Sequence, residues 1–128
     1  MSMVDPDRKK IMIGIVGPCG SGKSTLMAGL RMKGYFGRHI AQEHSYVPYM
    51  WKRITNPDLL IYLNASFESC TKRRKLNWTN EDYQEQLRRL SHAREHADLI
   101  IDTDSISPDE VLSKLVDYLK SKLQYPVL

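Results

Sequence analysis

The fold of this chain is decided by the stretch Gly17-Pro18-Cys19-Gly20-Ser21-Gly22-Lys23-Ser24, which satisfies the pattern G-x-x-x-x-G-K-[ST]. An apolar run of strand length, residues 11–16, precedes this stretch, and a helical pattern follows it. The glycines let successive backbone N–H groups point inward around phosphate oxygens, and the helix adds its positive dipole end. The stretch therefore predicts a P-loop that binds a nucleoside triphosphate.

The P-loop predicts a role for each of its polar side chains. Lys23 is expected to neutralise the β- and γ-phosphates, the Ser24 hydroxyl to ligate magnesium, and Thr25 to contribute at the α-phosphate. The expected cofactors are thus ATP and Mg²⁺, with Ser24 as the metal ligand. The residues predicted to bind them are Gly17, Pro18, Cys19, Gly20, Ser21, Gly22, Lys23, Ser24 and Thr25.

Strand-like apolar runs alternate with helical segments along the rest of the chain. This alternation predicts an α/β fold with three layers, α/β/α, and a small, mostly parallel, doubly wound sheet. We expect one domain over residues 1–128, with flexible ends at 1–10 and 125–128. Strands are expected at 11–16, 38–42, 59–63 and 99–102, and helical segments at about 24–33, 48–54, 66–74, 79–97 and from 107 onward.

Composition narrows the classes of protein to which the chain can belong. No apolar run approaches the roughly 20 residues that span a bilayer, and the first residues do not resemble a secretory signal, so a cytoplasmic protein is expected. Cys19 and Cys70 form no disulfide framework and are interpreted as thiols that fill packing space. The net charge of +4 suits nucleotides as well as nucleic acid, and a nucleic-acid partner is not expected.

A second acidic residue is expected beside the P-loop, as a magnesium partner or as a general base. The second apolar strand ends in Asn64 where an acid is expected, so Glu43 is the preferred residue. It is predicted either to hold a metal-bound water or to accept a proton from an acceptor hydroxyl; the alternative is a solvated loop acid. Asp102 and Asp104 compete for the same role and are ranked below Glu43.

Two clusters of basic residues are candidates for a functional role. Within the basic run of residues 72–75, Arg73 and Arg74 are predicted to belong to a lid that compensates charge during phosphoryl transfer; the alternative is a solvated helix face. His92 and His96 are spaced as neighbours on a helix, but no metalloprotease motif surrounds them, and no zinc site is expected.

Several segments together resemble the P-loop nucleoside and nucleotide kinase superfamily. They are residues 17–25, 57–63, 72–75 and 98–103, and the strand and basic helix among them are most similar to deoxynucleoside kinase and thymidylate kinase relatives. The resemblance implies ATP rather than GTP, and it makes Glu43-His44 the counterpart of an acid–arginine pair, with histidine in place of arginine. Residues 34–56, which separate the first helix from the second apolar strand, form an abbreviated acceptor region by the same comparison.

The functional prediction is a kinase-like phosphotransferase that moves a γ-phosphate from ATP to a small-molecule acceptor, with Lys23, Glu43, Arg73 and Arg74 as its catalytic residues. The alternative is a nucleotide-binding regulatory or interaction module with little or no turnover. A GTPase switch is disfavoured, because the chain contains neither a D-x-x-G segment nor an N-K-x-D base reader.

Overall fold

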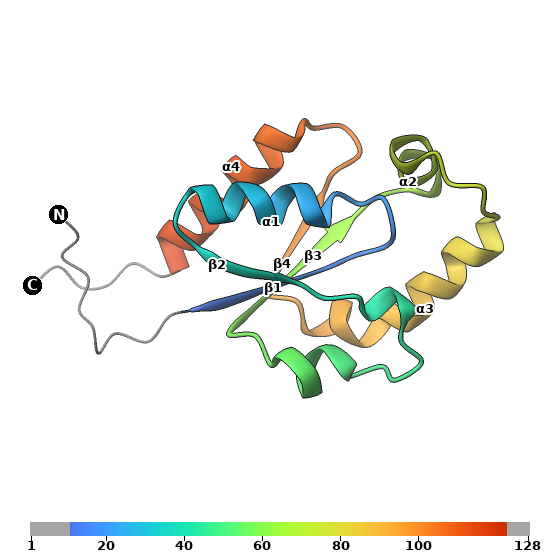
Figure 1. Ribbon diagram of the computed structural model, residues 1–128, viewed down its shortest axis with the longest axis horizontal. Coiled ribbons are helices and arrows are strands. Elements are labelled where there is room, and N and C mark those ends of the chain that lie inside the picture. Colours follow the sequence, from blue (N-terminus) through green and yellow to red (C-terminus); the bar gives the residue numbers. More distant parts are fainter. Residues whose placement is uncertain (1–10, 123–128) are drawn as a thin grey trace, which may run out of the picture.

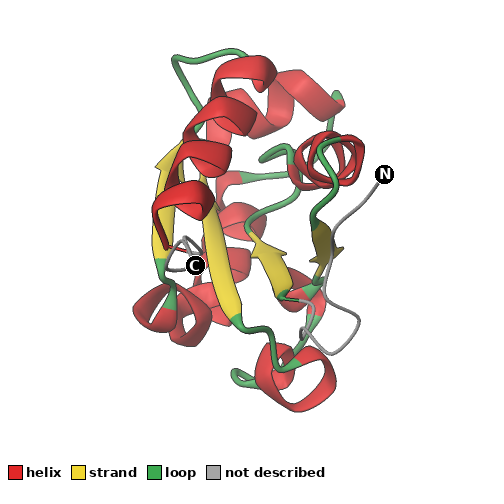
Figure 2. Ribbon diagram, turned by 90° about the vertical axis from the view of Figure 1, so that its left-hand side faces the viewer, coloured by secondary structure: helices red, strands yellow, loops and turns green. Residues whose placement is uncertain are grey.

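The computed structural model describes residues 11–122, which form a four-stranded sheet between layers of helices (Figures 1 and 2). The strands are β1 (Met12–Val16), β2 (Phe36–His39), β3 (Leu59–Asn64) and β4 (Leu99–Asp102). Their order across the sheet is β2-β1-β3-β4, and every neighbouring pair is parallel. This arrangement confirms the predicted three-layer α/β fold with a parallel sheet.

Helices cover both faces of the sheet. Helices α1 (Lys23–Met32) and α4 (Pro108–Lys122) lie on one face, and α3 (Asn80–His96) lies on the other with a short helical turn, Trp51–Thr55 (Figure 1). Helix α2 (Phe67–Arg74) follows β3 beyond its carboxyl end. The carboxyl ends of the strands are thus left open at one edge, which is where α/β folds place their ligands.

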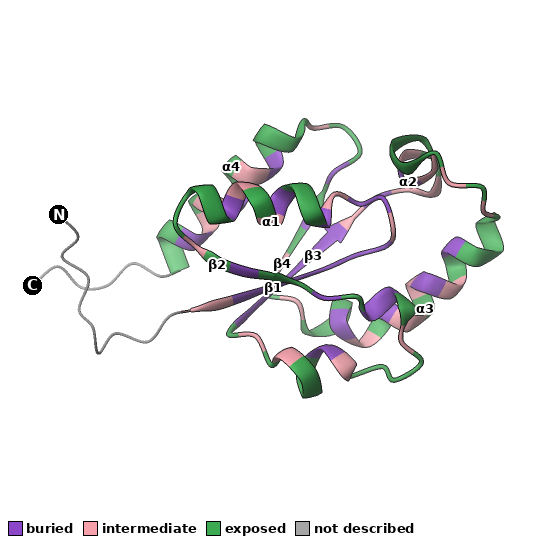
Figure 3. Cartoon of the chain, viewed as in Figure 1, coloured by how far each residue is buried: buried purple, intermediate pink, exposed green. Residues whose placement is uncertain are grey.

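Two apolar cores hold the layers together. Between the sheet and α1 with α4 lies a cluster that includes Ile13, Ile61, Leu30 and Leu115, all fully buried. A second cluster is buried on the opposite face and consists of Val16, Ile40, Trp51, Leu60, Tyr62, Leu90 and Ala93. Strands β1 and β3 are covered on both faces, and nearly all of their residues are buried (Figure 3). Their sequences are therefore continuous apolar runs.

Helix caps predicted from the sequence are present. The Ser66 hydroxyl accepts a hydrogen bond from the Ser69 N–H at 3.1 Å and begins α2. At the start of α3, Thr79 and Asp82 exchange the two hydrogen bonds of a capping box. Such caps fix the first residue of a helix because they satisfy backbone N–H groups that have no partner within it.

One strand lies elsewhere than predicted. The strand expected at 38–42 runs instead from Phe36 to His39, where Met12 pairs with Phe36 and Ile15 with His39. The chain leaves the sheet after Ile40 and forms a 3₁₀ turn, Gln42–His44, because the buried Gln42 side chain bonds to backbone groups there and not to a strand. The predicted flexible ends lie outside the described residues.

Within residues 11–122, no helix is both long enough and apolar enough to cross a membrane.

Candidate functional site: a cleft at the P-loop

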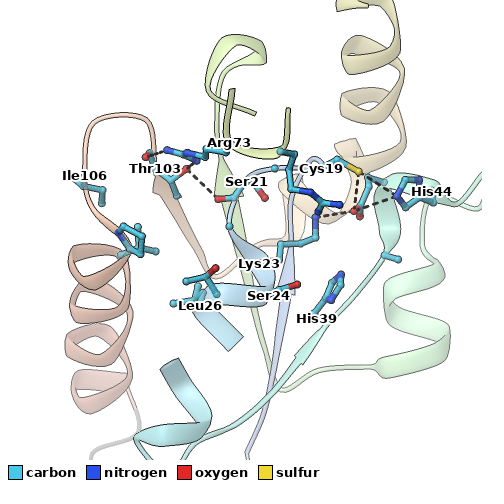
Figure 4. A pocket seen from close by; sticks show the side chains of 18 residues that line it. Cys19, Ser21, Lys23, Ser24, Leu26, His39, His44, Arg73, Thr103 and Ile106 are labelled. Carbon is cyan, nitrogen blue, oxygen red and sulfur yellow. Dashed lines mark hydrogen bonds and ion pairs between the residues drawn. The ribbon is translucent and has the colours of Figure 1, made fainter. Parts of the chain in front are cut away.

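A cleft of about 670 Å³ opens at the carboxyl edge of the sheet (Figure 4). This volume lies within the range of small-molecule sites. Its walls come from the P-loop and α1, the segment after β2, helix α2, and the loop that leads from β4 to α4. The lining residues are Cys19, Gly20, Ser21, Gly22, Lys23, Ser24, Thr25, Leu26, His39, Ala41, Glu43, His44, Arg73, Arg74, Thr103, Ile106, Pro108 and Val111.

The P-loop has the backbone geometry expected of an anion cradle. Gly20 and Gly22 adopt φ angles of 85° and 105°, which residues other than glycine rarely adopt. Helix α1 begins at Lys23 with no side-chain cap and no acidic residue in its first turn. Its first N–H groups and its positive dipole end are therefore available to an anion such as a phosphate.

Lys23 lies at the centre of this cradle and is held by three acceptors. Its ammonium donates to the carbonyl of Gly17 at 2.7 Å and to that of Pro18 at 3.2 Å. It also forms an ion pair with Glu43, with 2.8 Å between Lys23 Nζ and Glu43 Oε2. The two side chains are 6% and 3% exposed, so the pair is shielded from water and its attraction is little screened.

The alternative that Glu43 is a solvated loop acid is wrong. The 3₁₀ turn Gln42–His44 buries Glu43 against the P-loop lysine, from which it is distant in sequence. The turn is fixed by the fully buried Gln42, which donates to the Val47 and Arg89 carbonyls and accepts from the Trp51 N–H. The second carboxylate oxygen, Oε1, is buried without a hydrogen-bond partner among the described residues. Glu43 therefore retains the capacity to accept one further hydrogen bond or to bind a cation.

Arg73 and Arg74 both line the cleft, so the fold brings the predicted lid residues to the P-loop. The Arg73 guanidinium donates to the Thr103 hydroxyl at 2.8 Å and to the Thr103 carbonyl (Figure 4). Thr103 in turn donates to the carbonyl of Ser21. Arg73 is thus connected to the P-loop through the residue that follows β4.

The competing acids take structural positions. Asp102 accepts from the Asn64 amide at 2.5 Å, which joins the ends of β3 and β4. Asp104 accepts from the Ser66 N–H at 2.9 Å. Burial by itself would raise the pKa of Asp104, but the hydrogen bonds from Ser66 and Ser69 outweigh it and lower that pKa. Neither acid lines the cleft.

Sequence reasoning missed several residues of the site. Thr103 and His39 line the cleft, and burial together with the charge of Lys23 lowers the pKa of His39. Gln86, on α3, accepts from the Cys19 N–H at 3.0 Å and steadies the P-loop. No motif identifies Gln86, since its role depends on how α3 packs. His44 can be found from the sequence, because it directly follows the predicted acid Glu43.

The residues present fit a nucleotide with magnesium. The buried Ser21 hydroxyl has no hydrogen-bond partner within residues 11–122, and Ser24 and Thr25 are exposed at the cleft. Together with the first N–H groups of α1, these hydroxyls supply donors and oxygen ligands of the kind that phosphates and Mg²⁺ require.

A comparison with solved structures supports the three-layer α/β fold. A shikimate kinase from Acinetobacter baumannii, solved in complex with shikimate, superposes with a TM-score of 0.63 at 15% identity, covering 91% of this chain and 97% of that one. A thymidylate kinase from Candida albicans gives 0.60 at 15% identity, with 90% and 93% covered. No family model and no curated protein sequence matches the chain. The chain has the α/β fold of the P-loop kinases.

Proposed function

We propose that this chain binds ATP with Mg²⁺ in the cleft and transfers the γ-phosphoryl group to a small-molecule acceptor. The observation that carries the proposal is the buried ion pair between Lys23 and Glu43, 2.8 Å long, at the mouth of the P-loop. It puts a carboxylate next to the ammonium that P-loops present to the β- and γ-phosphates. Phosphoryl transfer to a hydroxyl needs such a carboxylate close to the transferred group.

Nucleotide binding exchanges the partners of Lys23. Its ammonium leaves the Gly17 and Pro18 carbonyls for phosphate oxygens, which are stronger acceptors because they are charged. With a nucleotide in the cleft, Glu43 would accept the proton of an acceptor hydroxyl or would hold a water of a Mg²⁺ ion, for which Ser24 would be the protein ligand. Arg73 and Arg74 supply positive charge from the other side of the cleft.

The acceptor is expected on the side of the cleft formed by the segment after β2. His39, Ala41 and His44 line that side, beside Glu43. A cytoplasmic location, with both cysteines as free thiols, is part of the same proposal.

Calorimetry with ATP and Mg²⁺ tests binding, and release of ADP in the presence of nucleosides, nucleoside monophosphates and small metabolites tests transfer. Wild type is expected to bind ATP, and one acceptor to accelerate ADP formation. Lys23→Met should abolish binding, Glu43→Gln should lower turnover by about 100-fold or more, and Lys114→Met on the exposed face of α4 should change neither. Absence of ATP binding by wild type would contradict the proposal.

A second candidate, a nucleotide-dependent regulatory module, has one observation in its favour. Three contacts already hold Lys23 in place, so nucleotide binding must rearrange the P-loop and Glu43 together. Tight binding of ATP with no turnover for any acceptor would support this candidate over the kinase.

A further inference from the structure

Three side chains with metal-binding atoms meet at the mouth of the P-loop. Cys19 comes from the P-loop itself, and Glu43 and His44 come from the 3₁₀ turn Gln42–His44. Cys19 Sγ lies 3.4 Å from His44 Nε2 and 3.9 Å from Glu43 Oε2, and the latter two atoms are 3.8 Å apart. Figure 4 shows the Cys19 and His44 side chains turned toward each other at this point.

These separations are close to the edges of a zinc coordination tetrahedron. Zinc bonds of about 2.3 Å to sulfur and about 2.0–2.1 Å to nitrogen or oxygen require ligand atoms roughly 3.3–3.6 Å apart. The three separations agree with this range to within about half an ångström. Small side-chain rotations would therefore complete the site.

A second observation points to a missing ligand. Glu43 is only 3% exposed, and its Oε1 has no hydrogen-bond partner among the described residues. A buried carboxylate oxygen without a partner is costly, since nothing replaces the water it has lost. A cation that is bound by both oxygens of this carboxylate, Oε1 as well as Oε2, would relieve that cost.

The surroundings already hold Cys19 in place, together with the backbone turn that carries Glu43 and His44. Gln86 accepts from the Cys19 N–H and donates from its own amide to Cys19 Sγ at 3.4 Å. This is the outer-shell hydrogen bond that a metal-bound thiolate favours. Arg89 approaches the Glu43 carbonyl at 3.4 Å, and Gln42 fixes the turn, so the backbone that carries Glu43 and His44 is held in place.

We infer that Cys19, Glu43 and His44 form a binding site for a borderline-soft divalent cation, Zn²⁺, at the mouth of the P-loop. The site is distinct from the Mg²⁺ site expected at Ser24, because Mg²⁺ selects oxygen ligands whereas thiolate and imidazole select Zn²⁺. Three protein ligands leave a fourth position open toward the cleft for water or a phosphate oxygen.

The proposed zinc ion and the Lys23 ammonium would contact the same oxygen of Glu43, so the charge of Lys23 should affect the affinity for zinc. Glu43 Oε2 is the oxygen that pairs with the Lys23 ammonium, so Zn²⁺ must compete with that ammonium. Removing the Lys23 charge takes away both the competitor and a nearby positive charge. Lys23→Met is therefore expected to bind Zn²⁺ several-fold more tightly than wild type.

The test is a titration of the full chain with Zn²⁺ and with Co²⁺, in reducing buffer and without nucleotide. One equivalent of Zn²⁺ is expected to bind, and Co²⁺ to show a thiolate-to-metal charge-transfer band. Cys19→Ser should abolish the band, and both Cys19→Ser and His44→Gln should weaken Zn²⁺ binding by about tenfold or more. His96→Gln is the matched control, because His96 is an exposed histidine stacked on His92 away from the cluster, and it should bind as wild type does.

Equal Zn²⁺ affinity of wild type and Cys19→Ser, a Co²⁺ complex without the thiolate band, or a loss of binding in His96→Gln alone would overturn the inference. Because no nucleotide is present, these outcomes are separate from any failure of ATP binding. Circular dichroism of each variant confirms that a loss of binding does not reflect unfolding.

Discussion

At the scale of single residues, the Lys23–Glu43 pair dominates the energetics of the site. Both side chains are almost fully buried and lie 2.8 Å apart, so each neutralises a charge that would otherwise stand without a partner in a poorly hydrated place. The contribution of this ion pair to stability is best measured as an interaction free energy, because removal of one charge also leaves the other without a partner.

A double-mutant cycle measures that coupling. Lys23→Met is expected to lower the free energy of unfolding by about 3 kcal/mol, because it leaves the buried Glu43 carboxylate without its partner. The double variant Lys23→Met/Glu43→Gln should recover most of this loss, because no buried charge remains. Urea unfolding at pH 7 provides the four free energies, and additive effects would show that the two charges do not interact.

The two cysteines are expected to differ sharply in reactivity. Cys70 is fully buried, and burial raises the pKa of its thiol to about 11, whereas Cys19 is partly exposed at the cleft. At pH 8 one thiol should react quickly with a disulfide reagent and one only through unfolding, and Cys19→Ser should remove the fast phase. A rapid reaction of both thiols in the wild type would contradict this expectation.

The same pKa shift gives Cys70 a defined effect on stability. The folded-state pKa lies above the ordinary value of 9.0, so the folded chain keeps this proton at pH values where the unfolded chain has lost it. Its contribution to stability is complete below pH 9 and is lost as the pH rises from there through about 11.

At the scale of elements, the P-loop is packed directly on helix α2. A side chain at Gly20 would place its Cβ 2.6 Å from the Cys70 carbonyl oxygen and 2.9 Å from Cys70 Cα. Backbone atoms in a helix do not move aside easily, so the contact requires glycine. It couples the P-loop to the helix that carries Arg73 and Arg74.

Gly20→Ala tests this contact, with Gly34→Ala as the matched control. Both positions have nearly the same positive φ, 85° and 88°, but a Cβ at Gly34 would meet no atom within 4 Å. We expect a loss of about 1 kcal/mol for Gly34→Ala, from backbone strain alone, and about 3 kcal/mol or more for Gly20→Ala. Equal losses in denaturant unfolding would show that α2 yields to the added methyl group.

At the scale of the whole molecule, the cleft joins segments that are far apart in sequence. The P-loop, the turn after β2, helix α2 and the loop before α4 all contribute to its wall. A ligand in the cleft therefore stabilises the folded chain as a unit, because unfolding any of these segments releases it.

Thermal unfolding with and without nucleotide measures this linkage. At an ATP–Mg²⁺ concentration about 100 times Kd, the chain should gain about 2.7 kcal/mol, and Tm should rise by roughly 10 °C for a domain of this size. The Lys23→Met variant should show almost no rise. An equal rise in wild type and variant would place the nucleotide somewhere other than the P-loop.

Much of the fold was determined by local sequence signals. The P-loop, the apolar runs of β1 and β3, and the caps at Ser66 and Thr79 each depend on residues close together in the chain. A helix cap joins residues that are three positions apart, and a strand that is buried on both faces is a continuous run of apolar residues. Both features can therefore be recognised within a few residues of sequence. Local sequence patterns therefore specify the class of fold and the position of the P-loop.

The side chains that surround the P-loop depend on tertiary contacts. The boundaries of β2 depend on its register with β1, and the burial of Glu43 depends on Gln42 and on the packing of α3. Cys19, His44 and Gln86 meet for the same reason, from three separate segments. Apolar patterns show that a strand or helix is buried, but they do not show which distant segment it packs against, so the partners of the P-loop are defined only when the chain is folded.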